Sequence, residues 1–310
     1  MLNPDDDTLW PLADGRLPLV PDAQPKLQVK VASKTHVGKM RKRNEDHHAV
    51  IRRTRHAEML STNLPPGTWA FGTEEAYLLL VADGVGGAAS GDQASQLAVK
   101  TVLDLAERAS SWVMKYHTSE FDAFRNRVEL YLELIQREFL ERAKREPELQ
   151  SMGTTLTLAV VLPPHALVVQ IGDSRAYCLR DHKLQQITRD QTLAQEMLDE
   201  GADPADARQY SNVLTNSLRC DATRLQAEVI HVELQADDRL LLCSDGLTDL
   251  VDDEAIAEVL ADCDPDTACA QLVERALDAG GYDNVTVIVS ALEACQTVHR
   301  EPGVGDAAGE

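Results

Sequence analysis

The sequence predicts a mixed α+β fold in which antiparallel sheets carry helices on their outer faces. Short runs of Val, Leu, Ile and Thr that are bounded by Gly, Pro, Asn or Asp indicate strands. Longer segments with apolar residues three and four positions apart indicate helices. The strands come in adjacent pairs and do not alternate regularly with helices, which favours antiparallel sheets over a doubly wound parallel sheet.

The predicted strands are spread along most of the chain. Each is a short apolar run that ends at a turn residue. They cover residues 28–35, 48–53, 77–82, 154–162, 166–171, 176–180, 239–243 and 285–290.

The predicted helices lie between these strands, at residues 92–108, 120–145, 193–200, 253–261 and 265–279. The second helix carries one apolar stripe made of Phe121, Phe124, Val128, Tyr131, Leu132, Ile135, Phe139 and Leu140. A stripe at helical spacing predicts packing against a core.

The composition is that of a globular protein with a strongly acidic surface. Of the 310 residues, 44% are hydrophobic, which excludes wholesale disorder. The chain has 30 Lys and Arg against 51 Asp and Glu, for a formal net charge of −21. A field of this sign repels phosphate backbones and anionic membranes, so we expect neither a nucleic-acid nor a membrane partner.

The sequence also bears on localisation. No apolar run approaches the roughly 20 residues that span a membrane, and the N-terminus is acidic where a signal peptide is basic. The six cysteines form no C-x-x-C pair, and Cys178 and Cys243 lie in apolar runs that predict buried thiols. We therefore expect a cytoplasmic protein.

We expect the chain to divide into three parts. Residues 1–26 contain five prolines that interrupt any periodic pattern, which predicts a poorly ordered leader. Residues 27–292 are expected to form one domain, since they contain no obvious linker. Residues 293–310 are rich in Gly, Ala and acids, which predicts a flexible C-terminal tail.

Aspartates stand at the ends of four predicted strands. Asp83, Asp173 and Asp245 each follow an apolar run, and Asp283 precedes one. A single Asp before Gly or Ser is most often a turn, but strands that share an edge bring their terminal acids together. Converging carboxylates repel one another unless a cation neutralises them. Because oxygen ligands suit Mg²⁺ or Mn²⁺, the pattern predicts a carboxylate metal site.

Two further segments have both a structural and a functional interpretation. Residues 83–91 contain four glycines, which fit a tight loop or a phosphate cradle at a helix N-terminus. Gly84 also lets a backbone carbonyl approach a metal closely. Residues 39–46 are a basic cluster that leads into Glu45 and Asp46, which fits a solvated loop or an arginine that binds a phosphoryl group beside acids holding metal-bound water.

Eight blocks of sequence, in order, resemble the bacterial branch of the metal-dependent PPM (type 2C) protein serine/threonine phosphatases. The resemblance covers roughly residues 28–291. The blocks read RKRNED (41–46), VADGVGGAASGDQAS (81–95), MGTTLT (152–157), IGDSRAY (171–177), QQITRDQTL (185–193), NVLTNSL (212–218), LLLCSDGLTDLV (240–251) and GGYDNVTVIV (280–289). The resemblance implies a four-layer α-β-β-α sandwich of two antiparallel sheets flanked by helices, with a metal cluster at one edge between the sheets.

The resemblance also implies a metal ligand set. Asp83 matches the carboxylate that bridges two ions, and Gly84 matches a ligand that binds through its backbone carbonyl. Asp245 and Asp283 match ligands of the second ion, and Asp173 matches an acid that helps to hold a weaker third ion. The implied cofactors are two or three Mn²⁺ or Mg²⁺ ions.

The remaining matches concern the phosphate and the reaction. Arg41 matches the phosphate-binding arginine, Glu45 and Asp46 match acids that act through metal-bound water, and Asn284 matches a residue beside the last ligand. The implied reaction is hydrolysis of phosphoserine or phosphothreonine by a metal-bridging hydroxide. The implied substrates are phosphoproteins, so we expect an enzyme that reverses bacterial Ser/Thr kinase signalling. We also expect a monomer.

Some residues depart from the family pattern. Val85 stands where some members have a histidine proposed as general acid, which leaves the proton donor open. Gln191 replaces a frequent histidine, and Asn216 and Arg219 also differ. These three lie within residues 188–222, the segment called the flap in this family, and they leave substrate preference open.

Two other classes of function remain as alternatives. A pseudophosphatase would keep the fold and bind phosphoproteins without turnover, although a decayed enzyme would usually have lost one of the ligands that are intact here. A haloacid-dehalogenase-type phosphohydrolase needs an Asp-x-Asp pair after its first strand, and Asp83-Gly84-Val85 does not supply one.

Overall fold

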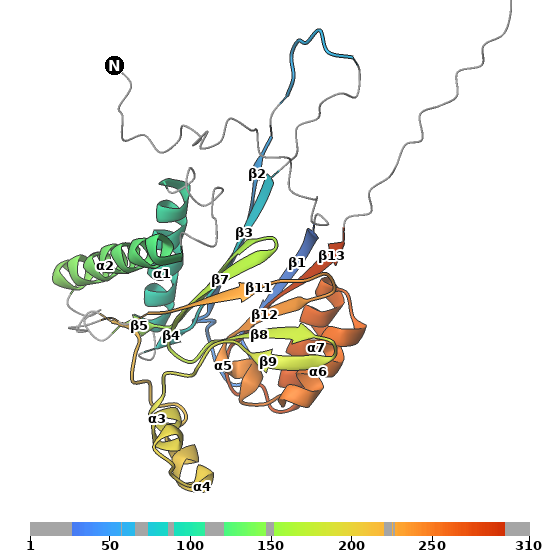
Figure 1. Ribbon diagram of the computed structural model, residues 1–310. Helices are drawn as coiled ribbons and strands as arrows, with labels where there is room; N and C mark the ends of the chain where they lie inside the picture. Colours follow the sequence, from blue (N-terminus) through green and yellow to red (C-terminus); the bar gives the residue numbers. More distant parts are fainter. Residues whose placement is uncertain are drawn as a thin grey trace, which may run out of the picture.

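The computed structural model describes residues 27–56, 58–65, 74–85, 90–108, 121–146, 152–219, 225 and 227–294. Two large sheets pack face to face between two groups of helices (Figure 1). This arrangement confirms the predicted α+β class and the α-β-β-α sandwich. The predicted leader and, apart from residues 293 and 294, the predicted tail lie outside the described residues.

Sheet 1 has the strand order β1-β13-β12-β8-β9. In that order its strands are Leu27–His36, Val285–Ala294, Arg239–Cys243, Arg175–Arg180 and Lys183–Gln186. Every neighbouring pair is antiparallel. The last strand of the chain therefore lies beside the first, which brings residues near both ends of the domain to the same edge.

Sheet 2 has the strand order β11-β7-β6-β3-β2 and is also antiparallel throughout. In that order its strands are Glu228–Glu233, His165–Ile171, Leu156–Leu162, Glu74–Ala82 and His47–Arg55. A small third sheet, β10-β5-β4, joins Leu218–Arg219, Gly153–Thr154 and Gly84–Val85.

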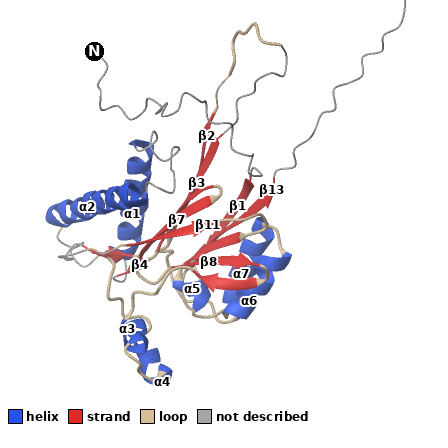
Figure 2. Cartoon of the chain, in the orientation of Figure 1, coloured by secondary structure: helices blue, strands red, loops and turns tan. Residues whose placement is uncertain are grey.

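The helices cover the outer faces of the sheets (Figure 2). Helices α1 (Ser90–Arg108) and α2 (Phe121–Arg145) lie on sheet 2, and α5 (Asp245–Thr248), α6 (Asp253–Asp262) and α7 (Pro265–Asp278) lie on sheet 1. Helices α3 (Leu193–Asp199) and α4 (Pro204–Ala207), followed by a 3₁₀ turn at Arg208–Tyr210, project from the body of the molecule (Figure 1). None of the described helices is long and apolar enough to cross a membrane.

Strand β3 shows why the sheets stack. Successive side chains of a strand point to opposite faces, so Leu79 and Val81 enter the core between the sheets while Leu80 and Ala82 enter the core under the helices. All four are fully buried. Burial of a leucine side chain contributes about 1.5–3 kcal/mol, so this strand is stabilised by apolar packing on both faces and places its C-terminal end rigidly.

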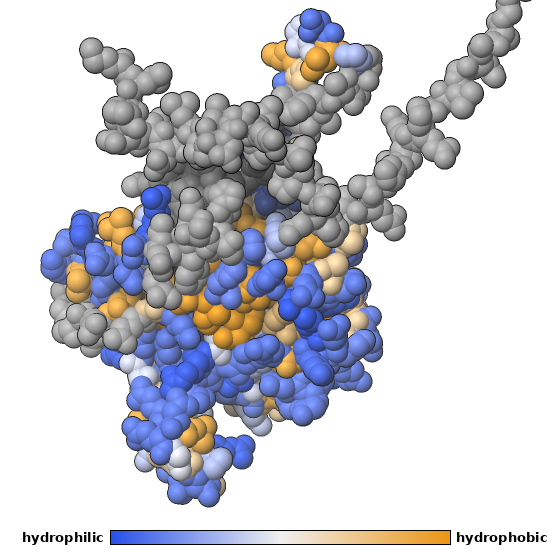
Figure 3. Space-filling model, in the orientation of Figure 1, coloured by the Kyte–Doolittle hydropathy of each residue, from blue (hydrophilic) through white to orange (hydrophobic). Residues whose placement is uncertain are grey.

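The outer helices present mainly hydrophilic residues. Figure 3 shows mostly hydrophilic residues over α3, α4, α6 and α7, with hydrophobic residues gathered over the strands in the middle of this face. The buried thiols predicted for Cys178 and Cys243 are confirmed.

Several predicted elements differ from the structure. The predicted strand 154–162 is broken at Thr155, because that residue bonds to Asp83 instead of continuing one ladder. Strands β9 and β11 were not predicted, since their sequences are polar and both lie at sheet edges. In the stripe of α2, Val128, Leu132, Ile135 and Phe139 are buried as predicted, but Leu140 is exposed, and the side chains of residues 121–125 lie outside the described set.

Candidate active site

The aspartates at the strand ends meet in one pocket. Asp83 follows β3, Asp173 follows β7, Asp245 follows β12 and Asp283 precedes β13, and these strand ends share one side of the sandwich. The pocket has a volume of about 220 Å³ and is lined by Arg41, Glu45, Asp83, Gly84, Val85, Asp173, Asn212, Leu214, Asp245, Asp283 and Asn284. The predicted site residues thus line one cavity, with the exception of Asp46, which is buried beside it.

Four acids in and beside this pocket, Asp46, Asp83, Asp173 and Asp245, are costly to ionise. Burial, followed by repulsion from Asp46 and Asp245, raises the pKa of Asp83 well above its ordinary value. Burial and the neighbouring Asp173 do the same for Asp245, although both Asp83 and Asp245 retain some exposed surface. Burial is also the main cause that raises the pKa of Asp173 to about 7 and of Asp46 to about 6. The cluster concentrates negative charge that its own cations do not offset.

Two buried carboxylate oxygens mark where a cation fits. Asp46 Oδ2 accepts hydrogen bonds from Ser244 Oγ and Thr286 Oγ1, both at 2.7 Å, but its Oδ1 has no partner among the described residues. Asp245 Oδ1 is likewise buried and without a partner there. Unpaired buried carboxylate oxygens are unfavourable, and hard divalent ions take such ligands. The donor set therefore fits Mn²⁺ or Mg²⁺.

The side chains alone do not complete a metal shell. Within the described ranges, no three His, Cys, Asp or Glu side chains are arranged to hold one ion by themselves. Mg²⁺ usually keeps several waters and uses only one or two carboxylates. An ion in this pocket would therefore also need oxygen ligands such as the Gly84 carbonyl and water.

Gly84 is required for close packing at this point. A Cβ on Gly84 would lie 2.4 Å from the carbonyl of Gly91 and 2.9 Å from the carbonyl of Glu45. The small sheet thus brings this backbone against the start of α1, which only glycine allows. The phosphate cradle was predicted for residues 83–91, and residues 86–89 of it lie outside the described residues.

Arg41 lies in the wall of the pocket and is paired with an acid. Its Nη2 donates to Asp283 Oδ2 at 2.5 Å, and this hydrogen bond is the main cause of a raised Arg41 pKa. About half of the Arg41 side chain remains exposed. Arg41 lines the pocket, and its guanidinium carries five N–H groups. Those that do not bond to Asp283 can donate to an anion in the pocket.

Asn284 holds the loop of residues 37–45 against the start of β13. Its Oδ1 accepts from Glu45 N at 2.7 Å, and its Nδ2 donates to the carbonyls of Val37 and Arg43, each at 2.9 Å. Its own N–H donates to Asp283 Oδ1 at 2.7 Å. One amide side chain thereby ties the loop that carries Arg41 to the strand start that carries Asp283.

A buried network of hydroxyl groups holds the backbone of Asp83. Asp83 N–H donates to Thr155 Oγ1 at 3.0 Å, and the Asp83 carbonyl accepts from Thr154 Oγ1 at 2.8 Å. Thr155 Oγ1 is also 2.8 Å from Ser174 Oγ, next to Asp173. The sequence analysis did not assign these residues a role, although Thr154 and Thr155 lie in the MGTTLT block.

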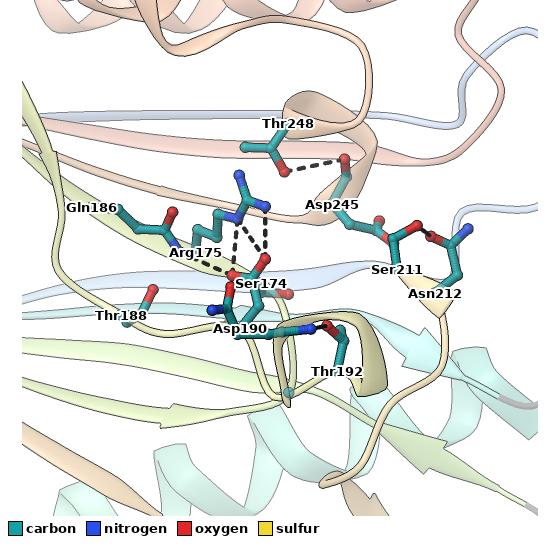
Figure 4. A network of polar contacts seen from close by, with 12 residues as sticks. Ser174, Arg175, Gln186, Thr188, Asp190, Thr192, Ser211, Asn212, Asp245 and Thr248 are labelled. Atoms are coloured by element: carbon teal, nitrogen blue, oxygen red, sulfur yellow. Dashed lines mark hydrogen bonds and ion pairs between the residues drawn. The ribbon is translucent and has the colours of Figure 1, made fainter. Parts of the chain in front are cut away.

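A second cavity adjoins the first beneath the flap. It has a volume of about 270 Å³ and is lined by Asp173, Arg175, Asp190, Thr192, Ala194, Gln195, Leu198, Pro204, Ala207, Arg208, Ser211, Asn212, Asp245, Thr248 and Asp249. Figure 4 shows Arg175 directed at Asp190, and the two make a bidentate pair with distances of 2.6–3.0 Å. Asp173, Asp245 and Asn212 line both cavities, so the two lie side by side with these residues between them. Sequence reasoning missed Arg175, Asp190 and Asp249.

Comparison with known proteins identifies relatives along most of the chain. A family model described as protein phosphatase 2C matches residues 68–278. The serine/threonine protein phosphatase PstP of Mycobacterium tuberculosis (strain ATCC 25618 / H37Rv) is 37% identical over 218 residues, which are 69% of this chain and 40% of that protein. The serine/threonine phosphatase stp of Listeria monocytogenes serovar 1/2a is 32% identical over 225 residues, or 68% of this chain and 83% of that protein. The chain thus matches 40% of the length of its mycobacterial relative.

Solved structures agree with these sequence relatives. The crystal structure of the M. tuberculosis phosphatase PstP/Ppp has a TM-score of 0.67 and 32% identity, and the match covers 86% of this chain and 99% of that one. The catalytic domain of PstP in complex with two manganese ions has a TM-score of 0.65 and 31% identity, with coverage of 86% and 100%.

Proposed function

Because the chain belongs to the protein phosphatase 2C family, we propose that it is a metal-dependent protein serine/threonine phosphatase that hydrolyses phosphoserine and phosphothreonine. The observation that carries the proposal is the single pocket that gathers Arg41, Asp83, Asp245 and Asp283 from four distant parts of the chain. Relatives that are named as phosphatases of this specificity support it.

In this proposal the acids hold the cofactor. Asp83, Asp245 and Asp283 would hold two ions together with the carbonyl of Gly84, and Asp173 would help to hold a weaker third. When bound, Mn²⁺ or Mg²⁺ would supply charge neutralisation and a water of lowered pKa as nucleophile. The unpaired buried oxygen of Asp245 supports its place in this ligand set, and that of Asp46 supports a cation beside it.

The other residues bind the substrate and support the ligands. Arg41 binds phosphoryl oxygens, with its fork of N–H donors exchanging part of its bond to Asp283 for the phosphate. Glu45 and Asp46 act through water, and Asn284 fixes the loop that carries Glu45. The described residues that line the pocket include no cysteine, so none of them offers a thiol nucleophile.

The finer parts of the proposal concern the cell. We infer that the substrates are phosphoproteins produced by a Ser/Thr kinase, and that the enzyme is a cytoplasmic monomer that needs no nucleic acid or membrane. A pseudophosphatase is the second candidate, because it would keep the same fold. The haloacid-dehalogenase alternative stays disfavoured, because Asp83-Gly84-Val85 supplies no Asp-x-Asp pair after its strand.

A metal-dependence assay tests the proposed function. Purified protein should hydrolyse p-nitrophenyl phosphate and a phosphothreonine peptide with added Mn²⁺, and should lose this activity with EDTA or with Asp245→Asn. Asp237→Asn, in an exposed turn, serves as the matched control and should remain active. Activity that resists EDTA would contradict the metal mechanism, and inactivity with every metal tested would favour the pseudophosphatase.

A further inference from the structure

Gln191, one of the departures from the family pattern, lies where the flap leaves the body. The two ends of the flap are joined by backbone hydrogen bonds: Leu193 N–H donates to the Val213 carbonyl at 2.8 Å, and Thr215 N–H donates to the Gln191 carbonyl at 2.9 Å. We call this paired segment, residues 191–193 and 213–215, the neck of the flap. Helices α3 and α4 extend outward from the neck (Figure 1). Whatever fixes the neck therefore sets the position of both helices.

The side chain of Gln191 joins the neck to the body. Its Oε1 accepts from Gly172 N–H at 2.7 Å and from Asn216 Nδ2 at 2.8 Å. The backbone N–H of Gln191 donates to the Gly172 carbonyl at 3.0 Å. Gln191 and Gly172 are thus paired in both directions, and the same oxygen also holds the returning end of the flap.

Gly172 connects this contact to the site. It is buried, it precedes Asp173, and its carbonyl also accepts from the buried Gln170 side chain at 2.9 Å. The next residue along, Ser174, belongs to the hydroxyl network that holds Asp83. A continuous set of hydrogen bonds therefore runs from the neck of the flap to the loop that carries Asp173.

The second cavity has one wall from each side of this contact. Leu198, Pro204 and Ala207 come from the flap, whereas Arg175 and Asp249 come from the body. The cavity adjoins the carboxylate pocket, where the phosphoryl group would lie, because Asp173, Asn212 and Asp245 line both. Residues of a protein substrate that flank the phosphorylated residue would therefore pass through this cavity, while a small aryl phosphate would not reach it.

We propose that Gln191 is a positioning residue that latches the flap to the Asp173 loop and thereby shapes the second cavity as a subsite for residues flanking the phosphorylated residue. The subsite rests on the proposed phosphatase function, but the latch itself does not. The acceptor oxygen of Gln191 is the essential feature, because both Gly172 and Asn216 present donors to it.

Hydrogen exchange at the Gly172 amide tests the latch without any turnover. Gln191→Met keeps the length of the side chain but has no strong acceptor, and it should speed Gly172 exchange about fivefold, the equivalent of one lost hydrogen bond. Gln191→Glu keeps an acceptor and should exchange as wild type, as should Gln209→Ala on the exposed 3₁₀ turn of the flap. Wild-type protection of Gly172 in Gln191→Met would overturn the latch. If Gln191→Met does not fold, Asn216→Ala provides the second variant, and it should loosen the 213–216 end of the neck to the same degree.

A comparison of substrates tests the subsite. With Mn²⁺ present, Gln191→Met should raise KM for a phosphothreonine peptide about fivefold, while kcat and KM for p-nitrophenyl phosphate stay close to wild type. Gln209→Ala should change neither. Equal changes with both substrates, or no change with the peptide, would overturn the subsite. If the wild-type enzyme hydrolyses neither substrate, the proposed function fails, and the exchange experiment still decides the latch.

Discussion

Asp83→Asn is expected to abolish phosphatase activity. Asp83 lies at the end of the rigid strand β3, its backbone is fixed by Thr154 and Thr155, and its carboxylate interacts with both Asp46 and Asp245. An amide removes the charge but retains the shape, so the fold should survive. The loss in kcat/KM should exceed the roughly 100-fold that follows mutation of a group supporting a metal ligand. Steady-state kinetics with Mn²⁺ check this, and activity within tenfold of wild type would contradict the assigned role. Asp237→Asn should remain fully active.

The same substitution should stabilise the metal-free protein. Folding raises the pKa values of four acids, Asp46, Asp83, Asp173 and Asp245. At pH values above the ordinary aspartate pKa, the folded state therefore binds more protons than the unfolded state. The favourable contribution of these protonated acids is complete below about pH 4, and it is lost as the pH rises through the folded pKa values of about 6 for Asp46 and about 7 for Asp173.

Thermal melts in EDTA at pH 5 and pH 7.5 measure this effect. Ionisation of this cluster should make the melting temperature of wild type lower at pH 7.5 than at pH 5. The decrease should be smaller for Asp83→Asn, because one repelling charge is gone. Added Mn²⁺ should raise the melting temperature of wild type and have little effect on Asp83→Asn. A lower melting temperature for Asp83→Asn than for wild type in EDTA at pH 7.5 would contradict the electrostatic account.

Gly246→Ala is the second substitution with a large expected effect. A Cβ on Gly246 would lie 2.0 Å from the carbonyl oxygen of Asn284 and 3.0 Å from its carbonyl carbon. Backbone atoms cannot rotate away, so the start of α5 must move from the start of β13. These two backbones carry Asp245 and Asp283, so the two proposed metal ligands would move apart with them. We expect overpacking to cost about 1–3 kcal/mol of folding free energy and kcat/KM to fall roughly 100-fold.

A matched glycine separates the steric effect from general destabilisation. Gly201 has a φ of +88°, and a Cβ there would meet nothing within 4 Å. Gly201→Ala should therefore cost about 1–2 kcal/mol through backbone strain alone, with activity retained. Denaturant melts and kinetics on both variants check this. Equal activity in Gly246→Ala and Gly201→Ala would show that the spacing of α5 and β13 does not matter for catalysis.

The sequence predicts the carboxylates of the site well for a physical reason. An apolar run that stops at an acid marks a strand end, and antiparallel sheets bring such ends together, as Asp83 and Asp245 show. The same local logic predicts most strands. Strand β11 was not predicted, because its Glu and His residues break the apolar run that marks a strand. Its place at the edge of the sheet becomes visible only from its pairing with β7.

The parts that sequence reasoning missed depend on contacts between distant residues. The bond between Arg41 and Asp283 joins residues 242 positions apart, and neither residue type alone indicates it. The pair of Arg175 and Asp190 joins residues 15 positions apart, on either side of the hairpin that β8 forms with β9. Gln191 reads as the loss of a histidine in the sequence, whereas the structure shows it as an acceptor for two donors.

Anomalous diffraction at the manganese edge, from crystals grown with Mn²⁺, tests the central assignment most directly. The account predicts two strong peaks inside the pocket, bonded to oxygens of Asp83, Asp245 and Asp283 and to the carbonyl of Gly84. Crystals of protein that is active with Mn²⁺ but shows no anomalous peak at these residues would contradict it.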